Sequence, residues 1–373
     1  MQYAHPALSP HRIGALALRN RLAVAPMTRV SAMPDGAATT EMADYYAEFA
    51  RGGFGLIVTE GIYTDTSHSQ GYPNQPGLAT EAHVEAWRGA TDAVHAHGVP
   101  FIAQLMHAGA LSQGNSFGVE TIAPSAVTPI GSPLGEYGGH DHWPSPRAAT
   151  EHDIRDATAG FADAAARAVA AGFDGVEVHA ANGYLLDQFL TVYTNQRDDA
   201  YGGDLVHRIR LTAEVVAAIR DRVGADVPIG VRLSQTKVND FAYRWPGGAA
   251  DAEVIFAALA RAGVDYLHVA SEGRDFIDTA RLSDGRTITA LAREVSGVPV
   301  MANGGMHDLR QAADVLDGGH ADLLSVARGA LANPDLPERL ASGAELIPFD
   351  HAMIQPMATI ANTREWSTAR SVR

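Results

Sequence analysis

The chain of 373 residues contains no cysteine. This absence excludes disulfide bonds, thiolate nucleophiles, zinc ribbons and iron–sulfur clusters that are held by cysteine. Lysine is almost absent as well, because Lys237 is the only one in the sequence. Chemistry that depends on a thiolate is therefore ruled out, and chemistry that depends on a lysine has a single candidate.

Positive charge is also scarce, since 28 Lys and Arg face 43 Asp and Glu and the net charge is −15. Proteins that bind nucleic acid or anionic membranes use a surplus of positive charge to replace counterions, so we expect neither partner here. No run approaches the roughly 18 consecutive apolar residues of a transmembrane helix. Residues 1–10 lack the basic and apolar regions of a signal peptide. We therefore expect a cytoplasmic protein that acts on small molecules.

What the sequence does contain is a repeated unit, in which a short apolar run precedes a longer amphipathic segment. The eight predicted strands cover residues 21–26, 56–62, 101–106, 175–179, 229–233, 266–270, 300–303 and 323–327. The eight predicted helices cover residues 40–51, 81–97, 151–171, 208–223, 250–262, 287–296, 309–317 and 334–341. This alternation predicts parallel strands joined by crossover helices.

Eight such units predict an α/β fold, a closed (β/α)8 TIM barrel that forms a single domain over residues 1–345. An open doubly wound sheet normally carries a glycine fingerprint after its first strand, but here Pro26, Met27 and Thr28 follow that strand. Long loops at residues 108–150 and 181–207 follow strands three and four, where barrels build their sites. We expect residues 346–373, the C-terminal tail, to pack on the barrel or on a neighbouring subunit of a possible homo-oligomer.

Polar residues and glycines follow or end most of the predicted strands. They are Thr28, Gly61, Gln104, His179, Arg232, Gly304, Gly305 and Arg328. Because reactive groups of barrels gather at the carboxyl ends of the strands, we predict that these residues share one face. The last three occupy the position at which barrels commonly bind phosphate, so we expect a phosphorylated ligand.

His179 and Asn182 lie three residues apart just past the fourth strand, and we predict that they sit on an incipient turn. An imidazole and an amide that converge on one oxygen polarise a carbonyl and stabilise an enolate. Tyr184 adds a phenol that is able to deliver a proton. The alternative for these three residues is a capped helix start with a buried histidine of structural importance only.

Longer motifs surround these positions. They are residues 20–29 (NRLAVAPMTR), 59–61 (TEG), 104–109 (QLMHAG), 179–190 (HAANGYLLDQFL), 195–197 (NQR) with 201–203 (YGG), 230–234 (GVRLS), 302–305 (ANGG), and 327–328 (AR) with 333–335 (NPD). In this order they resemble the Old Yellow Enzyme family of flavin-dependent ene-reductases. The resemblance extends over roughly residues 8–340 and implies a TIM barrel, tightly bound FMN, and NADPH or NADH as the reductant.

The resemblance also implies roles for the cofactor-binding residues. Ala25, Pro26, Met27 and Thr28 would lie along the flavin ring, with the Thr28 hydroxyl tuning the flavin, and Gly61 would contact the cofactor. Gln104 and Arg232 would hold the pyrimidine end, where the charge of Arg232 stabilises the anionic reduced flavin. Gly304, Gly305, Ala327 and Arg328 match the phosphate-binding positions.

A reaction follows from the same resemblance. NAD(P)H would pass hydride to N5 of the flavin, and an alkene conjugated to a carbonyl or nitro group would then take the place of the nicotinamide. His179 and Asn182 would hold the carbonyl oxygen, Tyr72 would line the pocket, and Tyr184 would protonate the α-carbon after hydride reaches the β-carbon. One site serves both substrates, so no separate dinucleotide-binding fold is required.

The chain departs from the family pattern in three places. Thr28 stands where one branch has cysteine, so the chain is similar to the threonine-type branch, and Ala327 replaces a usual glycine. The loop at residues 114–147 is weakly matched. Its Phe117, Tyr137 and Trp143 are candidates to line the pocket, but we expect them to pack within the loop instead. Because cysteine is missing and little chain follows residue 340, we do not expect this protein to be one of the larger relatives that have an iron–sulfur cluster and an additional nucleotide domain.

Two other classes stay open. A phosphate-binding barrel aldolase or isomerase would need a lysine Schiff base or a metal, for which the candidates are Lys237 and the loop residues His140, Asp141 and His142. We expect no metal, because these three residues lie in a loop and no metal ligands flank Lys237. A non-catalytic flavin-binding protein is the other class, and it would need neither a carbonyl clamp nor an acid.

Overall fold

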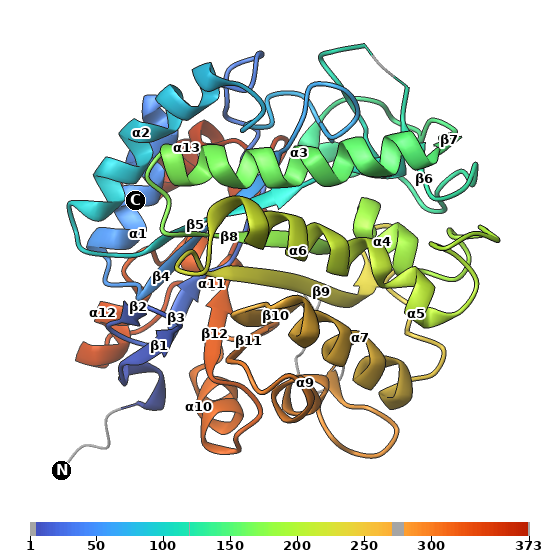
Figure 1. Ribbon diagram of the computed structural model, residues 1–373. Coiled ribbons are helices and arrows are strands. Elements are labelled where there is room, and N and C mark those ends of the chain that lie inside the picture. The colour runs from blue at the N-terminus through green and yellow to red at the C-terminus, as the bar shows by residue number, and fades with distance from the viewer. Residues whose placement is uncertain (1–4, 119, 271–279, 372–373) are drawn as a thin grey trace.

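The computed structural model describes residues 5–118, 120–270 and 280–371. Eight strands form a closed barrel in which every neighbouring pair is parallel, as Figure 1 shows. They are β3 (Leu22–Val24), β4 (Leu56–Tyr63), β5 (Phe101–Met106), β8 (Gly175–Asn182), β9 (Ile229–Lys237), β10 (Tyr266–Ala270), β11 (Val300–Asn303) and β12 (Leu323–Val326). Their order around the barrel follows their order along the chain. The predicted TIM barrel is therefore confirmed.

Helices lie outside these strands in Figure 1. They are α1 (Thr40–Arg51), α2 (Glu81–His95), α3 (Glu151–Ala170), α4 (Leu185–Leu190), α5 (Leu205–Arg208), α6 (Arg210–Val223), α7 (Ala249–Ala262), α9 (Ile288–Ser296), α10 (Leu309–Asp317), α11 (Arg328–Ala332), α12 (Leu336–Ser342) and α13 (Ile360–Ser371). Their ends follow local signals: Thr150 and Asp153 form a capping box at the start of α3, and Gly263 ends α7 with a φ of 90°. The short α11 was not predicted.

A hairpin that was not predicted closes the amino end of the barrel. Its strands are β1 (His11–Ile13) and β2 (Leu16–Leu18), which pair antiparallel. Ile13 and Leu18 pack in one apolar cluster with Leu56, Met301 and Leu323 from the barrel strands. Because apolar side chains fill this end, the polar interior of the barrel lies toward the carboxyl ends of the strands.

The two long loops contain short elements of their own. The loop after β5 holds η2 (Gly109–Leu111), β6 (Ile122–Ala123), η3 (Gly135–Tyr137) and β7 (Arg147–Ala148), and the loop after β8 holds α4 and α5. The remaining short helices are η1 (Pro6–Leu8) and η4 (His351–Met353). Strands β8 and β9 run farther than predicted, to Asn182 and Lys237, so they carry their last residues to the rim of the barrel.

The C-terminal tail folds back on the barrel, where α13 packs against α1. Arg29, directly after β3, donates from Nη2 to the Thr359 carbonyl (2.6 Å) and to Thr363 Oγ1 (2.5 Å). The Ile360 amide donates to Ser31 Oγ at 3.0 Å. The domain division at residue 345 and packing on a second subunit stay predictions, and residues 1–4, 119 and 372–373 of the predicted regions lie outside the described residues.

Candidate active site

A cavity of about 860 Å³ opens at the carboxyl ends of the barrel strands. Its walls come from the ends of β3, β4, β5, β8, β9, β11 and β12, together with the loop around η3 and the C-terminal tail. This volume lies in the range of small-molecule and cofactor sites. All the predicted site residues line this cavity except Ala25 and Tyr72.

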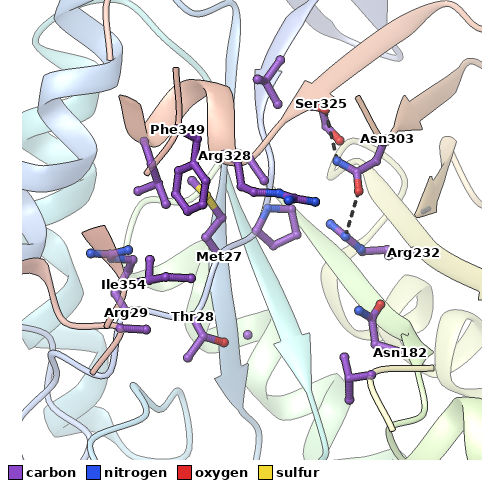
Figure 2. A pocket seen from close by; sticks show the side chains of 18 of the residues that line it. Met27, Thr28, Arg29, Asn182, Arg232, Asn303, Ser325, Arg328, Phe349 and Ile354 are labelled. Atoms are coloured by element: carbon purple, nitrogen blue, oxygen red, sulfur yellow. Dashed lines mark hydrogen bonds between the residues drawn. The ribbon is translucent and has the colours of Figure 1, made fainter. Parts of the chain in front are cut away.

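One end of the cavity has the features of a phosphate site. Gly304 and Gly305 have φ angles of 123° and 67°, a region of backbone conformation that favours glycine. Ala327 precedes α11 with a φ of −98°, so the alanine that replaces the usual glycine adopts its conformation without left-handed strain. Figure 2 shows the Arg328 side chain directed into the cavity. A guanidinium beside the backbone amides of two glycines that line the cavity suits a phosphate monoester.

The wall formed by the ends of β3 and β4 brings the backbone close to the cavity. Pro26, Met27 and Thr28 line the cavity after β3, whereas Ala25 is buried behind them and donates its amide to the Val326 carbonyl at 3.0 Å. Gly61 lies in β4, where a Cβ atom would come within 2.5 Å of Met106 Sδ. A larger residue at position 61 would therefore push Met106 out of its place in the cavity wall.

A buried polar layer lies under the cavity. Glu177 of β8 is fully buried and accepts hydrogen bonds from Gln104 Nε2 (2.8 Å), Tyr266 Oη (3.0 Å) and His268 Nδ1 (2.9 Å). Burial alone would raise the pKa of Glu177, but His268, the charge of Arg232 and Gln104 hold this pKa at about 2. Glu177 is therefore an anion that fixes the orientation of the Gln104 amide.

Arg232 brings a positive charge to the same floor. Its Nη2 donates to Asn303 Oδ1 at 3.4 Å, and Asn303 Nδ2 donates to the Ser325 carbonyl at 3.1 Å, as the dashed lines in Figure 2 show. The side chain is buried and borders the cavity. A guanidinium fixed in this way stabilises negative charge that develops on a ligand above it.

His179, Asn182 and Tyr184 come together on the opposite wall. The rings of His179 and Tyr184 meet edge to face with centroids 5.0 Å apart. The predicted turn at these residues is wrong in part, because His179 and Asn182 both belong to the extended strand β8, whose register shifts between Ala180 and Asn182. This irregularity, with a φ of 66° at Asn182, turns both side chains toward the cavity.

The electrostatics of this wall favour neutral groups. Burial, reinforced by the charge of Arg232, lowers the pKa of His179 to about 3. The imidazole is therefore neutral near pH 7 and presents one donor and one acceptor nitrogen. Among the described residues, no partner bonds to Nδ1 of His179 or to Oδ1 of Asn182, although both atoms are buried. Buried polar atoms without partners are uncommon, so a ligand in the cavity is expected to bond to this pair.

Tyr72 is close to the site but not in its surface. It is 1% exposed, packs against Tyr137 with ring centroids 5.4 Å apart, and shares an apolar cluster with Tyr184. Burial raises the pKa of Tyr72 well above its usual value, while the neighbouring Thr28 lowers this pKa. The structure thus places Tyr72 behind Thr28 and Tyr184, and its predicted contact with substrate stays a prediction.

Several cavity residues were missed by the sequence analysis. Tyr137 lines the cavity, so the expectation that it packs only within its own loop is wrong. The other two aromatic residues of this loop do not line it: Trp143 is buried, and Phe117 packs on Tyr63. Asn303 ends β11, and a polar residue at a strand end was the signal that would have found it.

The C-terminal tail also forms part of the cavity, which no local pattern indicated. Its lining residues are Phe349, His351, Ile354 and Ala358. Figure 2 shows Phe349 and Ile354 on the same side as Met27 and Arg328. The Ala358 amide donates to the Glu136 carbonyl at 2.8 Å, which joins the tail to the loop around η3. These two segments together enclose the cavity from above the barrel.

The residues that the other enzyme classes would need lie elsewhere. Lys237 does not line the cavity, because its Nζ is buried in an ion pair with Asp187 Oδ1 at 2.6 Å. A Schiff-base lysine must reach its substrate, so this placement disfavours an aldolase. His140, Asp141 and His142 are exposed in the loop after β5. Within residues 5–118, 120–270 and 280–371, no group of three potential ligands is arranged to hold a metal ion.

The residues of the cavity fit the flavin that the sequence resemblance implies. An end suited to phosphate, a wall that contains Pro26, Thr28 and Gly61, and a floor with the Gln104 amide and the Arg232 guanidinium would suit the phosphate, the ring and the pyrimidine of FMN. His179 and Asn182 also line this cavity, and His179 Nδ1 has no partner among the described residues. No helix in the described part of the chain is both long and apolar enough to cross a membrane.

Comparisons with known proteins show the family of this chain. Residues 8–346 match the NADH:flavin oxidoreductase / NADH oxidase family. Chanoclavine-I aldehyde reductase of Penicillium roqueforti is 35% identical over 354 residues, which cover 92% of this chain and 91% of that protein. The Old Yellow Enzyme homologue from Zymomonas mobilis superposes with a TM-score of 0.82 at 33% identity, covering 92% of this chain and 94% of that one.

A nicotinamide complex is among the similar structures. Morphinone reductase in complex with tetrahydroNAD superposes with a TM-score of 0.81 at 32% identity and covers 92% of both chains. The expected cofactor and reductant are therefore confirmed at the level of the family. The chain belongs to the NADH:flavin oxidoreductase / NADH oxidase family, that of Old Yellow Enzyme, and is an NAD(P)H-dependent flavin oxidoreductase with FMN as its cofactor.

Proposed function

We propose that this enzyme reduces the carbon–carbon double bond of activated alkenes, namely α,β-unsaturated carbonyl compounds and nitroalkenes. The observation that carries the proposal is the neutral His179 imidazole, whose buried Nδ1 has no partner among the described residues, beside the Asn182 amide group in the lining of a cavity that suits FMN. Bound FMN supplies the redox chemistry, which is the acceptance of hydride from the nicotinamide and its return to the β-carbon of the alkene.

His179 and Asn182 would bind the carbonyl or nitro oxygen. A neutral imidazole with one N–H and an amide with two N–H donors polarise this oxygen as negative charge develops on it. The low pKa of His179 supports a hydrogen-bonding role rather than that of a charged acid. Polarisation of the oxygen makes the β-carbon more electrophilic, which is where hydride must add.

Tyr184 would deliver the proton to the α-carbon. Its ring lines the cavity and packs against His179, so the phenol lies beside the site of the polarised oxygen. A phenol holds its proton near neutral pH and releases it only to a strongly basic carbon. Hydride and proton then reach adjacent carbons of one substrate, which completes the reduction.

The names of the relatives support a reductase of small organic molecules. The relative from Penicillium roqueforti is named for the reduction of an aldehyde, and another is named for morphinone. The cavity also has apolar walls above the floor, formed by Val238, Ile354 and Ala358. Apolar walls with a few placed polar groups favour a hydrophobic substrate that carries a single acceptor group.

The proposal is tested by an anaerobic absorbance experiment on the flavin-loaded protein. NADPH, or NADH in a parallel run, is expected to bleach the flavin, and 2-cyclohexenone or a nitroalkene is expected to restore the oxidised spectrum. If the flavin bleaches but no activated alkene restores it, the proposed substrate class is wrong.

Variants separate an enzyme from a protein that only binds flavin. Tyr184→Phe is expected to slow alkene reduction by about 10²-fold or more, as the loss of a general acid does, without loss of flavin. His179→Ala is expected to weaken substrate binding as well. The matched controls are His207→Ala, which is half-buried on α5, and Tyr193→Phe, and both residues lie outside the cavity. Wild-type rates in both active-site variants would contradict the assigned roles.

A further inference from the structure

The segment that carries Asn182 and Tyr184 has an unusual backbone. Asn182 and Gly183 are both in the left-handed region, with φ angles of 66° and 88°. A non-glycine residue rarely adopts this conformation unless its surroundings hold it there. The direction of the Asn182 amide and of the Tyr184 phenol depends on these two residues, so the contacts that hold them decide the geometry of the substrate clamp.

Strand β9 and the residue that follows it supply two of these contacts. The Asn182 amide donates to Ser234 Oγ at 2.8 Å, and the Val238 amide donates to the Asn182 carbonyl at 3.1 Å. Both hydrogen bonds hold Asn182. Neither holds Gly183, which connects Asn182 to Tyr184.

Two further contacts hold Gly183 itself. Gln188 Nε2 donates to the Gly183 carbonyl at 2.7 Å, and a buried ion pair holds the Gly183 amide. Asp187, in the first turn of α4, accepts from the Gly183 amide with Oδ2 at 2.7 Å and from Lys237 Nζ with Oδ1 at 2.6 Å. The two side chains are 0% and 1% exposed, and Nζ lies 4.7 Å from the centroid of the Tyr243 ring. Each oxygen of the Asp187 carboxylate therefore has its own donor. Because the carboxylate is rigid, the bond of Lys237 to one oxygen sets the position of the oxygen that accepts from the Gly183 amide.

The pair lies behind the cavity rather than in it. Asn182, Tyr184 and Val238 line the cavity, whereas Asp187 and Lys237 do not. Burying two charges is expensive, and apolar side chains of similar volume commonly stabilise a fold as well or better. What the pair adds over an apolar substitute is a charged acceptor oxygen, held in one orientation against the Gly183 amide.

We propose that the Lys237–Asp187 ion pair positions the substrate clamp by holding the Gly183 amide, which fixes Asn182 and Tyr184 relative to His179. The two residues are positioning residues and do not touch the substrate. This inference rests on the proposed function for its catalytic consequence. Its structural part, the anchoring of Gly183, does not depend on that function.

The test is the double variant Asp187→Leu/Lys237→Met in the flavin-loaded protein, which removes both charges without leaving one unpaired. A second variant, Asp187→Asn/Lys237→Met, keeps an acceptor oxygen at position 187. The matched control is Arg293→Met/Asp322→Leu, because Asp322 pairs with Arg293 at 2.8 Å and accepts from the Val300 amide at 2.9 Å. That pair holds the amino ends of β11 and β12, away from the cavity.

Two readouts are measured on each protein. The first is amide hydrogen exchange in residues 180–186, measured by mass spectrometry. The second is function, measured as the rate of 2-cyclohexenone reduction and as the dissociation constant of the ketone cyclohexanone. In Asp187→Leu/Lys237→Met we expect about ten-fold faster exchange, a rate lower by about ten-fold or more, and weaker ketone binding, since small displacements of catalytic groups have large effects. Asp187→Asn/Lys237→Met should recover part of each. The control should leave exchange in residues 180–186 unchanged.

Unchanged exchange in residues 180–186 in both Asp187 variants would overturn the proposal whatever the activity. Faster exchange with wild-type rate and ketone binding would also overturn it, because the pair would then serve the fold alone. If the wild-type protein reduces no activated alkene, the proposed function has failed, and the exchange data still decide whether the pair anchors Gly183. If the leucine variant does not fold, the asparagine variant is compared with the wild type instead, and its exchange in residues 180–186 should still be faster, by a smaller factor.

Discussion

Replacement of Glu177 by glutamine is the most direct perturbation of the layer under the cavity. The carboxylate accepts hydrogen bonds from Gln104, Tyr266 and His268. An amide in its place has one acceptor oxygen and presents an NH2 group toward donors. The change removes a negative charge near Arg232 and alters the volume of the side chain very little, so its effect reports on hydrogen bonding and charge.

The magnitude follows from the pKa of the group in the two states. The ordinary pKa of 4.5 falls to about 2 in the folded protein, which corresponds to roughly 3 kcal/mol of stability. Because the folded-state pKa is the lower one, this stability is fully present above pH 4.5 and is lost as the pH falls toward 2. By about pH 3, on the order of 2 kcal/mol should already be gone.

The assay is unfolding by urea at a series of pH values between neutrality and about pH 3. We expect Glu177→Gln to be less stable than the wild type by roughly 3 kcal/mol near pH 7 and the difference to shrink in acid. Glu214→Gln is the control, because Glu214 accepts a single hydrogen bond from Tyr201 at 2.9 Å on the outer helix α6. If the wild type and Glu177→Gln were equally stable at pH 7, or if the difference between them did not change with pH, the Glu177 carboxylate would not stabilise the fold through these hydrogen bonds.

Three further predictions concern the site and the tail. The pKa of His179 is about 3, so the imidazole should stay neutral across the neutral pH range. The pH profile of the alkene reduction rate should therefore have the same shape near pH 6.5 in the wild type and in His179→Ala. An inflection near pH 6.5 in the wild type that is missing in His179→Ala would mean that the imidazole titrates there. Gly61→Ala places a Cβ 2.5 Å from Met106 Sδ and should cost about 1–3 kcal/mol in thermal unfolding, whereas Gly89→Ala, with open space around it in α2, should be neutral or stabilising. Arg29→Met removes the hydrogen bonds to the tail and should cost about 2 kcal/mol, with faster proteolysis within residues 346–371; an equally resistant tail would count against its anchoring by Arg29.

The repeating part of this fold is readable from local patterns. Strands β5 and β10 and helix α1 have the bounds that the sequence predicted, because an apolar run or an amphipathic segment is delimited by its own neighbours along the chain. Reactive groups of barrels lie at the carboxyl ends of the strands, and this rule correctly predicted that most of the candidate site residues share one cavity. These inferences needed only periodicity and topology.

Contacts between distant segments were beyond such patterns. Nothing near Ile354 or Ala358 in sequence indicates that they face the cavity, because their position depends on the bonds of Arg29 and Ser31 to the tail. The hairpin of β1 and β2 was missed since two strands of three residues show no periodicity. The Lys237–Asp187 pair joins residues 50 positions apart, and a lone lysine past a strand gave no sign of burial.

The anchoring of the tail by Arg29 sets an order of events during synthesis. The hydrogen bond from Arg29 to Thr363 joins residues that are 334 positions apart. At the usual pace of translation, this separation corresponds to a delay on the order of tens of seconds. During that time Thr28 is already part of the chain, whereas Ile354 and Ala358, which line the same cavity, have not been synthesised. The segment of the tail that covers the cavity is therefore synthesised last, after the barrel strands and the cavity residues up to Arg328.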